Sequence, residues 1–234
     1  MSELKETLRD VISGAGTACA ALLHNCRLEG AGARAYGREE ILYLFRNARG
    51  SLDWVQLVEG KRCAALFTSD ASGPIAMFAD LYEGRITRLW YLASTALAAA
   101  PAQRIDVPFD PAVGETEPGV AFDPADHPDL QAAHVARVHS WSAGLLEGDG
   151  DEAPLPRVVA GLSRPRLGVL RAFSSGDLVA VLAMLNAQRD DGRAGIAQFL
   201  IAARLTAEHG SGATTVVDEA GRQTELARTW RPAL

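Results

Sequence analysis

The hydrophobic positions near the start of the chain follow a helical repeat. Leu4, Leu8, Val11 and Ile12 are spaced as i, i+4, i+7 and i+8, which places them on one face of a helix. Further along, apolar residues predict a short second helix over 17–24, an irregular strand and loop over 26–36, and a third helix after 37.

From residue 52 the pattern changes to short apolar runs separated by turn residues. Glycine-containing turns at 59–61 and 82–84 each join two such runs, which is typical of β-hairpins. The predicted strands are 52–59, 62–68, 74–81 and 85–92. The first part of the chain is therefore predicted to fold as helix, helix, strand, helix and then a meander of strands.

The next segment is rich in proline, which disfavours both helices and central strands. Its prolines are Pro101, Pro108, Pro111, Pro118, Pro124 and Pro128. We therefore predict a domain over 1–95, a proline-rich linker over 96–127 and a second domain over 128–234.

The second domain repeats the helix-then-strand order. A helix is predicted from 130 to 141, and a hairpin turn at 174–177 joins the strands 167–173 and 178–185. The segment 196–207 fits either a strand or a helix, because its apolar spacing suits both. Two more strands are predicted over 214–218 and 222–230.

Composition and charge narrow the function classes. The 234 residues are 48% hydrophobic, carry a formal net charge of -6 and include three cysteines. The acidic balance disfavours nucleic acid and anionic membrane surfaces as partners. The sparse cysteines indicate reduced thiols, and the N-terminus lacks the apolar core of a signal peptide, so we expect a cytoplasmic protein.

Short words recur in the two halves in the same order, which suggests a duplication. Leu28-Glu29-Gly30 reappears as Leu146-Glu147-Gly148, Gly60 corresponds to Gly176, and the segment 84–89 corresponds to 221–226. By this correspondence Glu147 is the counterpart of Glu29.

The first half resembles the NTF2-like superfamily, in particular its SnoaL-like and ketosteroid-isomerase-like branches. The resemblance rests on Gly37-Arg38-Glu39-Glu40-Ile41 at the entry to a helix and on the hairpin from Phe78 to Trp90. It implies an α+β fold. With the repeat, it predicts two tandem NTF2-like cones, each a curved antiparallel sheet packed against N-terminal helices.

The resemblance also implies where chemistry could occur. Isomerase-like members place a carboxylate base just after the first strand, the position that Glu29 holds here and that Glu147 holds by the repeat. The alternative is that each is a surface carboxylate at the end of a strand. Ala76 occupies the place of an oxyanion-stabilising acid, which weakens the isomerase interpretation.

Strand alternation extends the candidate pocket beyond the glutamates. We expect Phe78, Asp80, Leu89 and Tyr91 to share the pocket face, with Ile86, Arg88 and Trp90 facing away. Trp54, Cys63 and Phe67 could line the cone or belong to a plain hydrophobic core. No histidine spacing suits a metal ion, and no cofactor is expected.

Two functions follow from these observations. The first is a pocket that binds a small apolar or aromatic molecule, with an isomerase or cyclase reaction at Glu29. The alternative is a non-catalytic ligand-binding or interaction module. In that case the outer sheet faces of the two copies pair as an internal pseudodimer, and the same kind of surface could join two chains in a homodimer.

Overall fold

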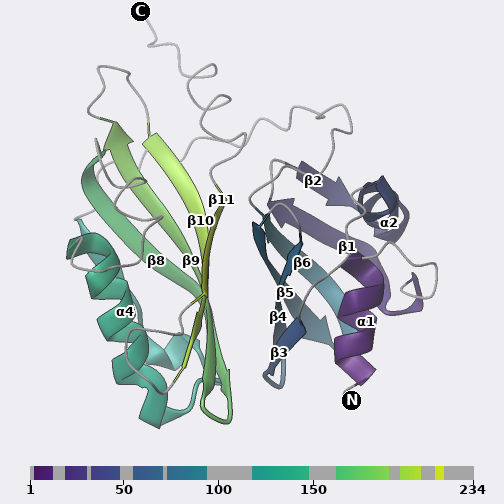
Figure 1. Ribbon diagram of the computed structural model, residues 1–234, viewed down its shortest axis with the longest axis horizontal. Coiled ribbons are helices and arrows are strands. Elements are labelled where there is room, and N and C mark those ends of the chain that lie inside the picture. Colours follow the sequence, from purple (N-terminus) through teal and green to yellow (C-terminus); the bar gives the residue numbers. More distant parts are fainter. Residues whose placement is uncertain are drawn as a thin grey trace, which may run out of the picture. The chain divides into compact units, whose positions relative to one another are not determined.

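The computed structural model describes residues 3–12, 19–30, 33–47, 55–70, 73–93, 118–147, 162–189, 196–206 and 214–218. The chain divides into two compact units, residues 1–103 and 104–234. Both contain a curved sheet and few helices (Figure 1), which is the mixed α+β character predicted from the sequence.

The described residues of the first unit form two helices and six strands. They are α1 (Glu3–Ile12), β1 (Leu22–Gly30), β2 (Ala33–Tyr36), α2 (Arg38–Asn47), β3 (Val55–Glu59), β4 (Cys63–Asp70), β5 (Gly73–Tyr82) and β6 (Arg85–Ala93). The strand order is β2-β1-β6-β5-β4-β3. The sheet is mixed rather than wholly antiparallel as predicted, because β1 pairs with β6 in the parallel direction.

The helix predicted over 17–24 is wrong in its described part. Only Cys19 and Ala20 form a short 3-10 turn, and β1 begins at Leu22. The amide of Ile86 donates to the carbonyl of Ala21 at 2.8 Å, so pairing with β6 takes this backbone into the sheet. Sheet pairing here overrides the local helical preference.

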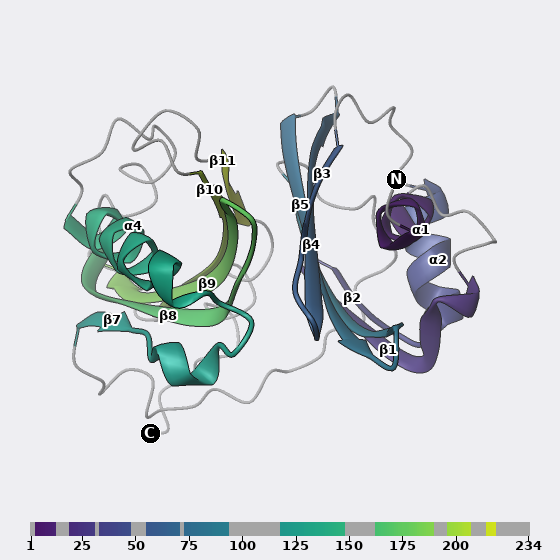
Figure 2. The same cartoon turned by 90° about the horizontal axis from the view of Figure 1, so that it is seen from below.

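Both helices of the first unit lie on one face of its sheet (Figure 2). Leu8 and Phe45 are fully buried in the apolar core they form with the sheet. The α2 helix begins as predicted after Gly37, with Glu39 and Glu40 in its first turn, where acidic side chains complement the helix dipole. Glu40 Oε2 also accepts a hydrogen bond from the amide of Tyr36 at 2.8 Å. From the sheet, the core takes Leu22, Cys26, Leu28, Ala64, Leu66, Ile75, Met77, Ala79, Ile86, Leu89, Tyr91 and Ala93.

The alternate strand positions point to the opposite face, here called the outer face of the first sheet. Register pairs Phe67 with Ala76, and Phe78 with both Ala65 and Trp90, so these residues lie side by side on that face. Its apolar members are Val58, Ala65, Phe67, Ala76, Phe78, Trp90 and Leu92.

A β-bulge in the β5–β6 hairpin changes which residues share a face of the sheet, so the predicted pocket face is wrong. The register shifts between Asp80 and Leu81. Asp80 pairs with Arg88, whereas Leu81 pairs with Ile86, so Thr87 is an extra residue without a partner position on β5. One inserted residue reverses the face of every residue after it. Phe78 therefore lies beside Trp90, whereas Leu89 and Tyr91 join the helix-covered core.

The bulge also explains why Ile86 lies on the opposite face from the one predicted. Ile86 was expected to face away from the helices, yet it is fully buried in the helix-covered core. Arg88 and Trp90 lie on the outer face as expected. Thr87 is held by a hydrogen bond that its Oγ1 donates to the carbonyl of Asp80 at 3.1 Å.

In the part of the second unit that the structure describes, there are one long helix and five strands. Its elements are β7 (Gly119–Ala121), η2 (Pro124–Asp126), η3 (Ala132–His134), α4 (Val135–Glu147), β8 (Leu162–Ser175), β9 (Leu178–Arg189), β10 (Ile196–Leu205) and β11 (Thr214–Asp218). The strand order is β11-β10-β9-β8-β7. The segment that fitted either a strand or a helix is thus a strand, and the strand predicted over 222–230 lies outside the described residues.

The α4 helix lies along the concave side of the curved sheet of its own unit (Figure 2). Val138 and Leu145 of this helix pack on the sheet positions that face it. The opposite positions form the outer face of the second sheet, where register joins Leu182 to Ala202 and Met184 to Leu200. Phe173 and Ala180 are a further pair on that face.

The end of the predicted linker belongs to the second unit. Within 96–127, β7 pairs in parallel with β8, and Asp123 caps η2 by accepting a hydrogen bond from the amide of Ala125 at 2.9 Å. Among the described residues, no helix is long and apolar enough to cross a membrane.

The repeated words fall on matching elements only in part. Gly60 lies between β3 and β4, and Gly176 lies between β8 and β9, so both belong to hairpin connections. Glu29 lies on strand β1, whereas Glu147 is the last residue of helix α4. Glu147 therefore does not hold the strand position that the repeat assigned to it, and the segment 221–226 lies outside the described residues.

Candidate functional site

The predicted base Glu29 lies on the outer face of the first sheet, away from the two helices. Register places it beside Trp90 of β6, which points to that face. Arg88 Nη2 donates to Glu29 Oε1 at 2.8 Å. The guanidinium carbon of Arg88 also lies 4.5 Å from the centre of the Trp90 ring. We call these three residues the Glu29–Arg88–Trp90 cluster.

The electrostatics of the cluster favour a fixed ion pair. A charge-assisted hydrogen bond between guanidinium and carboxylate holds both groups in place, and the stacked indole favours the cation. The side chains of Glu29 and Arg88 are 24% and 40% exposed, so water still screens the pair. Glu29 Oε1 thus already accepts a hydrogen bond from Arg88.

Charged side chains continue around the cluster. Asp80 lies opposite Arg88 in register, and Arg27 lies next to Arg88 on the neighbouring strand. The guanidinium carbon of Arg27 is 5.7 Å from the ring centre of Tyr36. The outer face therefore has a charged end at β1, β2 and the hairpin tip, and an apolar remainder across β3 to β6.

Removing the carboxylate charge should have a small effect on stability. We expect Glu29→Gln to lower the free energy of unfolding by no more than about 1 kcal/mol, because partly exposed ion pairs contribute little. Urea unfolding of the full chain measures this change, with Arg85→Gln at the exposed hairpin tip as the control. A loss of several kcal/mol would contradict this account of the ion pair.

The helix-covered side of the first sheet holds a different group of candidates. Leu89 and Tyr91 lie there, and the Tyr91 ring meets that of Phe45 edge-on with centroids 5.1 Å apart. Burial raises the pKa of the Cys26 thiol to about 12, so this thiol stays protonated at neutral pH. Thr68 is fully buried, and its Oγ1 has no hydrogen-bond partner among the described residues.

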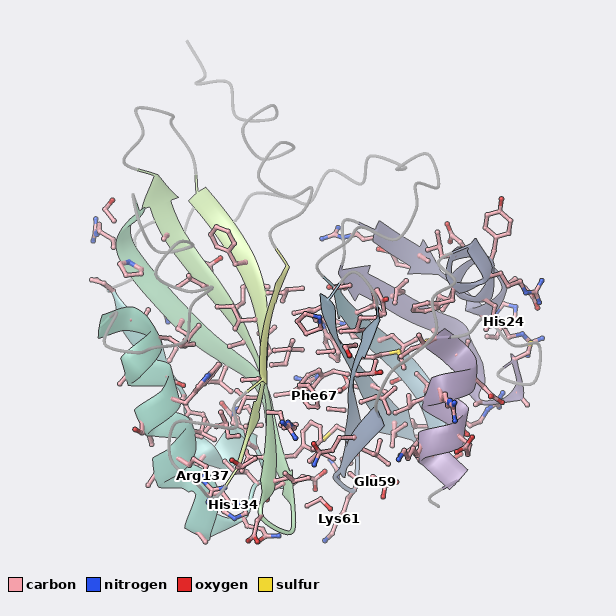
Figure 3. All side chains as sticks on the ribbon, viewed as in Figure 1. His24, Glu59, Lys61, Phe67, His134 and Arg137 are labelled. Atoms are coloured by element: carbon pink, nitrogen blue, oxygen red, sulfur yellow. The ribbon has the colours of Figure 1, made fainter. Side chains whose placement is uncertain are left out.

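The candidate pocket residues are thus divided between two faces. Cys63, Phe67, Phe78 and Asp80 belong to the outer face, where the Phe67 and Phe78 rings meet edge-on with centroids 5.8 Å apart. Figure 3 shows Phe67 on the side of its sheet away from α1 and α2. Leu89 and Tyr91 belong to the helix-covered face. Trp54 and the side chain of Glu147 lie outside the described residues.

Several polar groups were not identified as candidates from the sequence. Arg88 was recognised only as facing outward, and its pairing with Glu29 depends on the parallel β1–β6 contact between distant segments. Glu6 Oε1 on α1 is buried without a partner within the described part of the chain. The same holds for Trp141 Nε1 and Ser142 Oγ on α4. For these buried polar groups, the one signal in the sequence is Ser142, a serine within an apolar helix, and that signal is weak.

Histidines in the second unit support its packing. The Phe122 ring stacks on His127 with centroids 5.3 Å apart and meets His139 edge-on at 4.8 Å. Burial lowers the pKa of His127, against an opposing effect of Asp126. Figure 3 places His134 and Arg137 near the β8–β9 turn, where Arg137 donates to the carbonyl of Asp177 at 2.9 Å. The described residues contain no group of three or more His, Cys, Asp or Glu side chains suited to a metal ion.

Comparisons with known proteins give weak structural likenesses. No protein-family model and no curated protein matches the sequence. A crystal structure of a "putative ketosteroid isomerase" from Kribbella flavida DSM 17836 is 18% identical, with a TM-score of 0.32, covering 46% of this chain and 89% of that one. A de novo designed protein with a curved β-sheet is also 18% identical, with a TM-score of 0.31, covering 39% of this chain and 86% of the other.

Proposed function

We propose that this protein is a non-catalytic interaction module in which the outer faces of the two sheets cover each other as an intramolecular pseudodimer. The observation that carries the proposal is the apolar outer face of the first sheet. Phe67, Phe78 and Trp90 lie there together with Ala76 and Leu92. These side chains are all buried, and an apolar sheet face of this kind is suited to pack against another apolar surface.

The second sheet offers a surface of matching chemistry. Its outer face carries Leu182, Leu200, Met184, Phe173 and Ala180, all on adjacent strands. When two sheets stack through apolar faces, both surfaces are removed from water. This burial contributes a favourable free energy of roughly 25 cal/mol for each Å² of apolar surface. Because the two faces belong to one chain, their association needs no second molecule.

Acid–base catalysis fits the arrangement less well. Glu29 is held on the outer face by the hydrogen bond that it accepts from Arg88. A proton transfer next to a carbonyl group needs an acid or base within hydrogen-bond reach of the substrate. The module is therefore proposed to act through binding, in the cytoplasm, with neither nucleic acid nor membrane as partner.

Sedimentation velocity combined with urea unfolding tests the pairing of the sheets. The full chain should sediment as a monomer, and its unfolding midpoint should not change between about 1 and 100 µM protein, since an intramolecular contact is independent of concentration. A midpoint that rises with concentration would show that the faces join two chains as a homodimer. That result would refute the intramolecular pairing.

A second candidate function is the binding of a small apolar or aromatic molecule beneath α1 and α2. The fully buried Thr68 hydroxyl favours it, because it lies without a partner among apolar side chains and could bind a ligand oxygen. Turnover of any such ligand that disappeared in Glu29→Gln would contradict the non-catalytic interpretation and restore Glu29 as a base.

A further inference from the structure

Residues 118–134, here called the strap, fasten to strand β8 of the second sheet before the long helix begins. The strap contains β7, which pairs with β8 (Figure 2), and the two short helices η2 and η3. The carbonyl of Asp129 accepts a hydrogen bond from the amide of Ser174 at 3.2 Å. Ser174 Oγ in turn accepts a hydrogen bond from the amide of Gln131 at 3.0 Å. Strand pairing and these hydrogen bonds therefore hold the strap to β8 at two places.

The buried residues of the strap are both histidines. His127 is 7% exposed and His134 is 6% exposed, whereas every other residue of the strap is half-buried or exposed. Buried positions are usually apolar, because an ionisable group loses its hydration when it is buried. The strap is instead anchored by side chains of a type that can gain a charge near neutral pH.

The ring of His127 is held by aromatic packing. It stacks on Phe122 with ring centroids 5.3 Å apart, and His139 of α4 meets the same phenyl ring edge-on at 4.8 Å. Phe122 packs in turn against the apolar core of this unit. The amide of His127 donates to the carbonyl of Pro124 at 3.1 Å, and its carbonyl accepts from the amide of Leu130 at 2.9 Å. His127 thus joins the turns of the strap to the core beneath them.

The surroundings of His127 favour its uncharged form. Burial disfavours the imidazolium and lowers the pKa of His127, and the Arg171 guanidinium on β8 acts in the same direction. The exposed carboxylates of Asp126 and Asp123 act in the opposite direction, but burial outweighs them. The closed strap therefore binds a proton less readily than an open strap, in which His127 would have its ordinary pKa of about 6.5.

We propose that the strap is a pH-sensitive element, which stays closed while His127 is uncharged and opens when acidification protonates this residue. Opening is favoured below about pH 6.5, because there the open form binds more protons than the closed form. It releases the hydrogen bonds to Ser174 and the β7–β8 pairing, and so uncovers an edge of β8 on which another strand could pair. The strap belongs to the second unit and does not depend on the pairing of the outer faces.

Amide hydrogen exchange of the full chain, followed by NMR from about pH 7.5 to 5, tests the proposal. After correction for the intrinsic exchange rate at each pH, protection of the Ser174 amide should fall below about pH 6.5, by up to about tenfold for each pH unit. Protection of the Val181 amide should stay unchanged, because β9 pairs on both sides within the sheet. An equal loss at Val181 would show that the whole unit unfolds and would overturn the proposal.

The matched variant is His127→Phe, because phenylalanine keeps an aromatic ring against Phe122 and cannot be protonated. Its Ser174 protection should not depend on pH in this range, whereas His139→Phe, at the exposed histidine on the same phenyl ring, should respond as the unchanged chain does. A pH response that persists in His127→Phe would assign it to His134 or to the nearby carboxylates and overturn the proposal. Titration of the His127 ring protons needs no variant, and a pKa of about 6.5 or above in the unchanged chain would overturn it as well.

Discussion

Replacing Gly30 by alanine should unfold the first unit. Gly30 has a φ of +119°, a backbone conformation that residues with a side chain rarely adopt. A Cβ atom built there would overlap the carbonyl oxygen of Tyr91 and lie 3.0 Å from its carbonyl carbon. The obstructing atoms are backbone atoms of β6, so they cannot move aside without breaking the β1–β6 pairing.

We expect Gly30→Ala to lower the free energy of unfolding by more than about 4 kcal/mol. A loss of this size is typical of backbone strain and overpacking in a buried region. Losses of that size approach the whole stability of a typical domain. Circular dichroism during urea unfolding, together with the dispersion of amide NMR signals, measures it.

Gly84→Ala is the matched control, because Gly84 also has a positive φ, +73°, but nothing within 4 Å of an added Cβ. That variant should cost only about 1–2 kcal/mol, the strain of the left-handed conformation alone. Equal unfolding midpoints for the two variants would show that β1 does not approach β6 as closely as described.

Replacing Phe67 by aspartate should be the second most damaging change. If the outer face of the first sheet is covered by the second sheet, Phe67→Asp removes a large apolar side chain and places a carboxylate in an apolar contact. We expect a loss of about 3–5 kcal/mol of unfolding free energy. Urea unfolding of the full chain, with sedimentation to check that the variant stays monomeric, measures the effect.

An exposed aromatic residue provides the comparison for Phe67. Tyr82 is 62% exposed on β5 of the same sheet, so Tyr82→Asp should stay within about 0.5 kcal/mol of the unchanged chain. If Phe67→Asp were as well tolerated as Tyr82→Asp, the outer face would be open to water and the pseudodimer would be excluded.

The local features of the first unit could be predicted from the sequence because short-range rules determine them. The spacing of Leu4, Leu8, Val11 and Ile12 predicted α1, and the residues after Gly37 predicted the start of α2. Glycine-containing turns predicted the β3–β4 and β5–β6 hairpins. Each of these signals lies within about ten residues of the element that it specifies.

The faces of the candidate site residues could not be predicted, because they depend on contacts between distant segments. The bulge at Thr87 leaves no clear mark in the sequence, yet it moves Leu89 and Tyr91 to the opposite face from Phe78. The side on which Glu29 lies is likewise fixed by the parallel pairing of β1 with β6. The sequence thus identified Glu29 as a candidate base without showing that Arg88 would be its partner.

Thiol labelling at the centre of the outer face tests the proposed pairing of the two sheets most directly. Ala76 lies between Phe67 and Leu92 in register, and a cysteine there adds only one sulfur atom. The measurement compares Ala76→Cys with Tyr43→Cys, at a residue 60% exposed on α2, both in a chain whose three natural cysteines are replaced by alanine.

We expect the thiol at position 76 to react with a disulfide reagent at least about 1000-fold more slowly than the thiol at position 43, because the covered face opens only through unfolding. The rate should not depend on protein concentration, since both sheets belong to one chain. Reaction as fast as at position 43 would contradict the account, as would protection that disappears when the protein is diluted.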